Sequence, residues 1–197
     1  MLLRYCPPGM TTAAIVAQIL DVAFPDAVTA LDPTFGHGKF WDGTQRVCLT
    51  AHDLDSARAP HGAMDFTDLA YADESFDVVL LDPPHLADAG RDSIMGRRFG
   101  TALNADLHTL VARGASEAWR VSRLGCVIKV TDHVHGQRLQ LESDWVRDAL
   151  LADPYDVVHQ VRKRSLVDPR WKQQLSAYSN GSTFLVFRHG PQTHIPR

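Results

Sequence analysis

The feature that most constrains the fold of this sequence is an apolar strand pattern followed at once by two prolines. Residues 76–81 read FDVVLL, nearly all apolar and rich in β-branched side chains. Such a run is typical of a strand that is covered on both faces of a sheet. Asp82-Pro83-Pro84-His85 follows directly. The prolines remove two backbone donors and restrict the backbone, which predicts a rigid, extended loop carrying a carboxylate and a ring. A stiff turn without further function remains the alternative.

Strand and helix patterns alternate along the rest of the chain. Helical spacing of apolar residues predicts helices over 11–24, 104–122 and 142–152. Short apolar runs predict strands over 28–31, 47–51, 76–81, 126–130, 155–161 and 183–187, with a weaker one over 63–66. This alternation predicts an α/β fold with a doubly wound, mostly parallel sheet. The last two strands lack an intervening helix, which suggests an antiparallel pair at the edge. Because we find no repeat or linker, we expect one domain over 1–197.

Composition excludes several classes of protein. The 197 residues are 45% hydrophobic and 22% charged, which is ordinary for a globular protein and argues against disorder. Three scattered cysteines without CxxC spacing disfavour a disulfide scaffold or a zinc knuckle and fit a reducing cytoplasm. The ten histidines form neither HxxxH nor HExxH, so we expect no metal. No apolar run approaches the roughly 18 residues of a membrane span, and the first residues do not resemble a signal peptide.

A glycine turn follows the first predicted strand, in the run Asp32-Pro33-Thr34-Phe35-Gly36-His37-Gly38. Two glycines in G-x-G spacing allow a sharp turn and a close approach of a ligand to the backbone. Trp41 stands where a dinucleotide fingerprint has its third glycine, and no GK[ST] follows, so NAD, FAD and P-loop readings are disfavoured. An acid at this turn would attract a positively charged ligand. A plain strand–helix junction explains the run equally well.

Two further acids follow predicted strand ends. A carboxylate at Asp53 can accept both hydroxyls of a ribose, although a cap or turn residue is the alternative. In Met64-Asp65-Phe66, the acid and the ring could hold the edge and the face of an adenine. Alone, that triplet is more often a turn.

In order and spacing, these clusters resemble the class I S-adenosylmethionine (SAM) methyltransferases, in particular those that methylate amino groups of nucleic acids. Their SAM loop is similar to residues 32–38, and their (D/N/S)-P-P-(Y/F/W) loop is similar to residues 82–85. The stretch 117–125 resembles the helix and turn before the fifth strand of that fold, and 183–188 resembles its last strand. The similarity covers roughly 5–132 and 183–188 and is greatest to small phage-like enzymes. It implies a Rossmann-like, seven-stranded sheet with an antiparallel C-terminal edge strand.

The resemblance also implies roles for individual residues. Asp82 and Pro83 would accept hydrogen bonds from an exocyclic amine and aim its lone pair at the methyl group, with Pro84 and His85 completing the catalytic loop. His85 stands where the family has Tyr, Phe or Trp, so the identity of the base is open. Cofactor-binding roles would fall to Asp32, Pro33, Thr34, Phe35, Gly36, Gly38, Asp53, Asp65, Phe66 and Pro8.

Charge along the sequence is uneven. Residues 51–92 hold ten acids against two arginines, whereas 159–197 hold seven basic residues against one acid. We interpret 86–103 and 162–182 as candidate substrate loops, because they carry basic residues and, in the second, an aromatic. Solvated surface is the alternative. The residues concerned are Arg97, Arg98, Arg162, Lys163, Arg164, Arg170, Trp171 and Lys172.

The sequence therefore predicts a cytoplasmic, SAM-dependent methyltransferase with a nucleic-acid partner. Adenine N6 of DNA is the first expectation, and cytosine N4 of DNA, or guanine N2 or adenine N6 of RNA, are alternatives. An enzyme acting on a small molecule or a protein is a second hypothesis. A non-catalytic, SAM-fold binding subunit is a third. The sequence does not indicate an oligomeric state.

Overall fold

The fold is built on one seven-stranded mixed sheet. The computed structural model describes residues 5–7, 9–43, 46–85, 107–135, 138–160 and 181–190. Its helices are α1 (Thr12–Ala23), α3 (Leu107–Val121), α4 (Glu142–Leu150) and the short 3₁₀ helix η1 (Ser56–Arg58). The strands of the large sheet are β1 (Tyr5–Cys6), β2 (Thr29–Asp32), β3 (Cys48–Ala51), β4 (Phe76–Leu81), β5 (Ser122–Val130), β8 (Asp156–Gln160) and β9 (Ser182–Arg188). A separate hairpin pairs β6 (His133–His135) with β7 (Arg138–Gln140).

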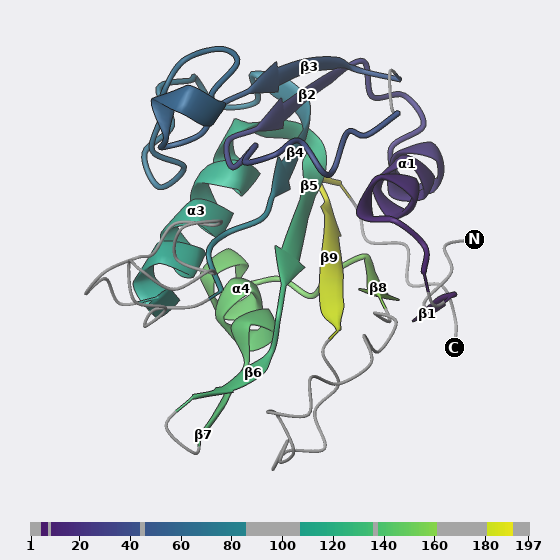
Figure 1. Ribbon diagram of the computed structural model, residues 1–197, viewed down its shortest axis with the longest axis vertical. Coiled ribbons are helices and arrows are strands. Elements are labelled where there is room, and N and C mark those ends of the chain that lie inside the picture. The colour runs from purple at the N-terminus through teal and green to yellow at the C-terminus, as the bar shows by residue number, and fades with distance from the viewer. Residues whose placement is uncertain are drawn as a thin grey trace.

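The strand order is β1-β8-β9-β5-β4-β2-β3 (Figure 1). The pairs β3–β2, β2–β4, β4–β5 and β1–β8 are parallel. The last strand, β9, is antiparallel to both of its neighbours, β5 and β8. This topology confirms the predicted Rossmann-like, mostly parallel sheet with an antiparallel C-terminal pair. However, β9 lies inside the sheet and not at its edge, because β8 and then β1 pair beyond it.

Helices cover both faces of the sheet, as the doubly wound prediction requires. Consecutive residues of β4 point to opposite faces. Val78 and Leu80 join the core under α1, whereas Val79 and Leu81 join the core under α3 and α4. All four side chains are fully buried, which explains why the run FDVVLL lacks polar alternation. Figure 1 shows α1 on one side of the sheet and α3 with α4 on the other.

The expected strand over 63–66 does not form. Ala63 makes only an isolated bridge to Asp53. The Asp65 carboxylate instead accepts hydrogen bonds from the backbone N–H and the hydroxyl of Thr67, both at 2.8 Å. Such a turn stops a strand because the acid replaces the ladder partner of the backbone. The seventh strand of the sheet is β1, which apolar periodicity does not reveal because it has only two residues.

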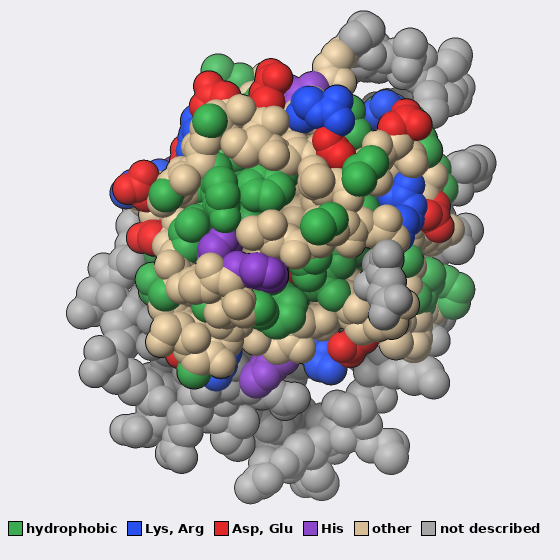
Figure 2. All heavy atoms as spheres, turned by 90° about the horizontal axis from the view of Figure 1, so that it is seen from above, with side chains coloured by type: hydrophobic (Ala, Val, Ile, Leu, Met, Phe, Trp, Pro, Cys, Tyr) green, Lys and Arg blue, Asp and Glu red, His purple; other side chains and the backbone are tan. Residues whose placement is uncertain are grey.

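The boundary between α3 and β5 differs from the predicted one, because no loop separates the helix from the strand. Ser122 was expected to end a helix, but it is the first residue of β5, so α3 runs directly into the strand. Its hydroxyl donates to the carbonyl of Trp119 at 2.9 Å and so closes the end of the helix. Within the described ranges no helix has the length and apolarity needed to cross a membrane. On the face shown in Figure 2, acidic and basic side chains are interspersed around the margin, and a patch of hydrophobic side chains with His side chains beside it lies near the centre.

Candidate active site

The glycine turn begins directly at the carboxyl end of β2. Gly36 and Gly38 both have positive φ, +55° and +67°, a conformation that favours glycine. A Cβ on Gly38 would lie 2.8 Å from the ring of Phe35, whereas a Cβ on Gly36 would meet, among the described residues, only the carbonyl oxygen of Thr34, at 3.8 Å. The turn is therefore closed on its inner side and open at Gly36, where a ligand can approach the backbone. Pro33, which precedes it, is buried.

Asp32 holds this turn from inside. It is only 2% exposed. One carboxylate oxygen accepts from the indole N–H of Trp41 at 2.7 Å, and the other accepts from the backbone N–H and hydroxyl of Thr34 at 3.0 and 3.3 Å. Burial raises the pKa of Asp32 to about 7, because the hydrogen bonds from the neutral donors Trp41 and Thr34 do not compensate for the lost solvent, and the nearby negative charge of Asp82 raises the pKa further.

A direct hydrogen bond joins the glycine turn to the loop after β4. The backbone N–H of Asp82 donates to the hydroxyl oxygen of Thr34 at 2.8 Å. The same hydroxyl donates to Asp32, so Thr34 links two acids that are 50 positions apart in the sequence. The carboxyl ends of β2 and β4 thus bring both predicted loops together, as neighbouring parallel strands should.

The Asp82 carboxylate lies between two cations. Lys129, on β5, donates to both of its oxygens, at 2.7 and 3.0 Å. His85 Nε2 lies 3.0 Å from Oδ1, and His85 Nδ1 lies 2.8 Å from the buried carboxylate of Glu142, the first residue of α4. Within this loop Pro83 is buried and Pro84 is half-buried.

Each charged group in this cluster favours the ionised form of its neighbour. Burial would raise the pKa of Asp82, but the hydrogen bond from His85 and the charges of Lys129 and His85 hold it below its usual range. Burial would lower the pKa of His85, but hydrogen bonds to Asp82 and Glu142, with the charges of both, raise it to about 9. His85 is therefore a cation at neutral pH.

The remaining predicted cofactor residues that the structure describes are Asp53, which contacts the glycine turn, and Asp65 and Phe66, which follow farther along the chain. The oxygens of Asp53 accept from the backbone N–H groups of Gly36 and Asp55, at 2.8 and 2.9 Å, so Asp53 ties the turn to the loop after β3. Asp65 forms the turn described above. Phe66 packs on α3 against Gly114, where a Cβ would come within 2.5 Å of its ring.

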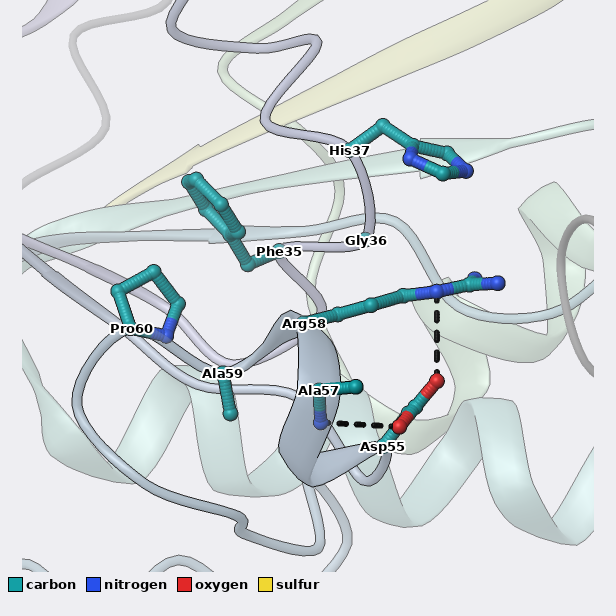
Figure 3. A pocket seen from close by; sticks show the side chains of 8 residues that line it. All are labelled: Phe35, Gly36, His37, Asp55, Ala57, Arg58, Ala59 and Pro60. Atoms are coloured by element: carbon teal, nitrogen blue, oxygen red, sulfur yellow. Dashed lines mark hydrogen bonds and ion pairs between the residues drawn. The ribbon is translucent and has the colours of Figure 1, made fainter.

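A pocket of about 660 Å³ opens beside the turn (Figure 3). Figure 3 shows Phe35 and Gly36 on one side and the η1 segment on the other, with Arg58 extended alongside its ion-pair partner Asp55. The Asp82 loop and Asp65 do not line it. The lining residues are Phe35, Gly36, His37, Asp55, Ala57, Arg58, Ala59 and Pro60.

Sequence reasoning missed three residues of this site. In the sequence, Trp41 is informative only because it replaces the third glycine of a dinucleotide fingerprint, whereas in the structure its indole N–H donates to Asp32. Lys129 stood within an apolar strand pattern, and a cation in such a run was the signal that could have pointed to it. Glu142 gave no signal beyond its place at a helix start. Pro8 and all of the predicted substrate residues, Arg97, Arg98, Arg162, Lys163, Arg164, Arg170, Trp171 and Lys172, lie outside the described residues.

No cluster of three or more His, Cys, Asp or Glu side chains suited to a metal occurs among the residues that the structure describes. The chain matches no protein-family model, and no curated protein matches it.

Solved structures do match. The structure of PH0851 has a TM-score of 0.50 and 16% identity, covering 88% of this chain and 45% of that one. The 1,6-didemethyltoxoflavin-N1-methyltransferase of Burkholderia thailandensis, solved with S-adenosylhomocysteine, has a TM-score of 0.49 and 16% identity, covering 90% and 77%. TrmN from Thermus thermophilus has a TM-score of 0.45 and 16% identity, covering 70% and 40%. At this identity the similarity to PH0851 shows a shared fold, and this chain spans less than half of that protein.

Proposed function

We propose that this chain is a SAM-dependent methyltransferase that acts on an exocyclic amino group of a nucleic-acid base, in the first place adenine N6 of DNA. The observation that carries the proposal is the 2.8 Å hydrogen bond from Asp82 N–H to Thr34 Oγ1, which sets the glycine turn beside the Asp-Pro-Pro-His loop. Both loops lie at the carboxyl ends of parallel strands, where sheets of this topology bind ligands.

The residues of the turn fit a cationic cofactor. Asp32 is a buried acid that no cation contacts among the described residues, and a nearby positive charge would favour its ionised form. The open side of Gly36 admits a ligand to the backbone. The proposed cofactor contacts are Asp32, Pro33, Thr34, Phe35, Gly36, Gly38, Asp53, Asp65 and Phe66, with Pro8 from the N-terminal segment.

SAM, when bound, supplies a methyl group on a positively charged sulfur. An exocyclic amine of a base is a weak nucleophile, because its lone pair is delocalised into the ring. Asp82 and the carbonyl of Pro83 would accept its N–H bonds and direct the lone pair, so their contribution is positioning and hydrogen bonding. Lys129 and His85 occupy three of the roughly four acceptor positions of the Asp82 carboxylate, which leaves one on Oδ2 for the amine.

The base and the polymer are set by contacts beyond this loop. A protonated imidazole at His85 offers less stacking area than the Tyr, Phe or Trp of the resembled family, so adenine N6, cytosine N4 and guanine N2 are compared in the test below. Nucleic acid, DNA before RNA, is the proposed partner, and 86–103 and 162–182 are its proposed contact segments. A cytoplasmic, single-domain enzyme fits this function.

The proposal predicts that Asp82→Ala abolishes methyl transfer while leaving SAM binding in place. We would incubate wild-type protein with labelled SAM and unmethylated DNA or RNA, digest the polymer and identify the methylated nucleoside by mass. Asp82→Ala should lower the rate by about a hundredfold or more, because a positioned hydrogen-bonding group is lost. The dissociation constant for SAM, measured by calorimetry, should stay within a few-fold.

Asp73→Asn is the matched control. Asp73 is exposed, pairs with Arg120 and precedes β4, so it lies at the opposite end of the strand from Asp82. Full activity of Asp82→Ala would refute the assigned chemistry. SAM binding by the wild type without transfer to either polymer would favour a small-molecule or protein acceptor, or the non-catalytic subunit.

A further inference from the structure

Glu142 is a fully buried acid whose hydrogen bonds connect three elements. It is the first residue of α4 and has no exposed surface. Its Oε2 accepts from the backbone N–H of Thr131, just after β5, at 2.8 Å. The same oxygen lies 2.8 Å from Nδ1 of His85, on the loop after β4. One carboxylate oxygen thus connects α4, the end of β5 and the loop that carries Asp82.

The hydrogen-bond chemistry sets the charge of His85. Both ring nitrogens face carboxylate oxygens, Nδ1 that of Glu142 and Nε2 that of Asp82. An ionised carboxylate only accepts hydrogen bonds, so both nitrogens donate, and an imidazole that donates twice is an imidazolium. The raised pKa of His85 agrees with this geometry.

The start of α4 has a separate attachment. The Asp132 carboxylate accepts from the backbone N–H and hydroxyl of Ser143, at 3.1 and 3.0 Å. Another acid is therefore already bonded to the first turn of the helix. Glu142 is directed instead toward the His85 side of the site. Burying an acid is costly unless it is paired, and within the described part of the chain His85 is a charged partner of Glu142.

We propose that Glu142 is a positioning residue that acts through a doubly donating His85 to hold the Asp82-Pro83 loop in the conformation that receives the acceptor amine. The inference rests on the proposed methyl transfer and extends it to a residue that does not touch the reacting atoms. Two groups bind the Asp82 carboxylate. Lys129 donates to it from β5, and His85, which is itself bonded to Glu142 on α4, contacts its Oδ1.

The charged groups facing this histidine in the described residues are Asp82 on its own loop and Glu142 on α4, with Lys129 facing Asp82 from β5. Removing the charge of Glu142 should therefore make His85 lose its proton at lower pH. Glu142→Gln keeps the size of the side chain and an acceptor for Thr131. It lowers the pKa of His85, because one of the two carboxylates that favour the protonated ring is lost.

The test measures methyl transfer against pH for the wild type, Glu142→Gln and the control Ser143→Ala, which alters the same helix start without touching His85. The acceptor is the polymer that the wild type methylates. The pKa of His85 is about 9 in the wild type, so kcat of Glu142→Gln should fall several-fold below the wild type near pH 9 and stay within about twofold of it at pH 7. KM for SAM should not change, and Ser143→Ala should follow the wild type.

A second measurement follows the proton itself. Nuclear magnetic resonance of the His85 ring, assigned by loss of its signal in His85→Gln, should give a titration well above pH 7 in the wild type and a lower one in Glu142→Gln. A wild-type titration near 6.5 overturns the inference even if Glu142→Gln does not fold. An unchanged pH profile in Glu142→Gln overturns it as well, with the proposed function intact. Failure of the wild type to transfer methyl groups overturns the proposed function and the role of Glu142 with it.

Discussion

Asp32 is a buried acid whose hydrogen-bond donors are all neutral. Its partners are the indole of Trp41 and the backbone and hydroxyl of Thr34. A carboxylate in that setting is costly to ionise, which is why its pKa rises to about 7. At the scale of single residues, the site thus includes an acid that is strained electrostatically near neutral pH.

This predicts a specific dependence of stability on pH. Between about pH 4 and 7 the unfolded chain releases the Asp32 proton while the folded chain keeps it, so the free energy of unfolding falls as pH rises and levels off above 7. A displacement of about three pKa units corresponds to about 4 kcal/mol. Asp32→Asn removes this contribution, so the variant should gain stability over the wild type from pH 5 to pH 8, measured by urea unfolding.

Asp42→Asn is the control for Asp32→Asn. Asp42 is more than half exposed and pairs only with Lys39 in the described residues, so Asp42→Asn removes one carboxylate without altering the hydrogen bonds of Asp32. Parallel curves for Asp32→Asn and the wild type would show that Asp32 ionises normally in the folded protein.

At the scale of elements, a glycine stands where β5 pairs with β4 on one side and with β9 on the other. Gly125 has a φ of +148°, and a Cβ there would lie 2.0 Å from the backbone oxygen of Phe187. The register of β4 against β5 also shifts between Phe76 and Val78, close to this point. The glycine therefore allows a bulged strand to pair on both sides.

Gly125→Ala should therefore destabilise the fold severely. Its methyl group meets backbone and not a movable side chain, so we expect a loss of about 3 kcal/mol or more in urea unfolding. Gly190→Ala separates steric conflict from backbone strain, because Gly190 also has a positive φ, +104°, but a Cβ there would meet nothing within 4 Å among the described residues. That control should lose only about 1 kcal/mol from backbone strain. Equal losses in the two variants would contradict the steric explanation.

At the scale of the whole molecule, charge is distributed unevenly. The acidic stretch 51–92 supplies three acids near the ends of strands: Asp53 follows β3, Asp65 lies between β3 and β4, and Asp82 follows β4. The basic stretch at the C-terminal end lies largely in the proposed contact segment 162–182. On the face in Figure 2, by contrast, charges of both signs alternate. A nucleic-acid partner would use the basic stretch, since phosphate contacts supply most of such affinity.

Replacing Arg162, Lys163 and Arg164 together by Ala should weaken binding to DNA or RNA and leave SAM binding unchanged. For duplex DNA, the slope of the logarithm of the binding constant against the logarithm of the salt concentration changes by about 0.9 for each phosphate contact. Losing three contacts should therefore make this slope shallower by about two to three. Fluorescence anisotropy at several salt concentrations measures this. A control triple variant, Lys39, Arg113 and Arg147 to Ala, removes the same charge elsewhere, and an identical loss there would indicate a general charge effect.

Local patterns in the sequence were sufficient to predict the class of fold and to single out two loops of the candidate site. The alternation of apolar runs and helical spacing predicted a mostly parallel sheet, because strand and helix periodicities are properties of adjacent residues. The Asp32–Gly38 and Asp82–His85 loops were found because glycine and proline act on their own backbone. Their proximity followed from the rule that parallel strands end at one edge. The turn at Asp65 was mistaken for a strand, since a side chain that caps its own backbone competes with apolar patterning.

What only the tertiary structure decided are the contacts between distant parts of the chain. Lys129 reaches Asp82 across 47 positions, and Glu142 reaches His85 across 57. The interior place of β9 and the pairing of β1 with β8 likewise depend on which strands meet. No periodicity encodes these choices, because they depend on packing the whole sheet. The sequence by itself thus determined the class of fold and placed two candidate loops at one edge of the sheet, and the tertiary structure determined the charged partners that surround them.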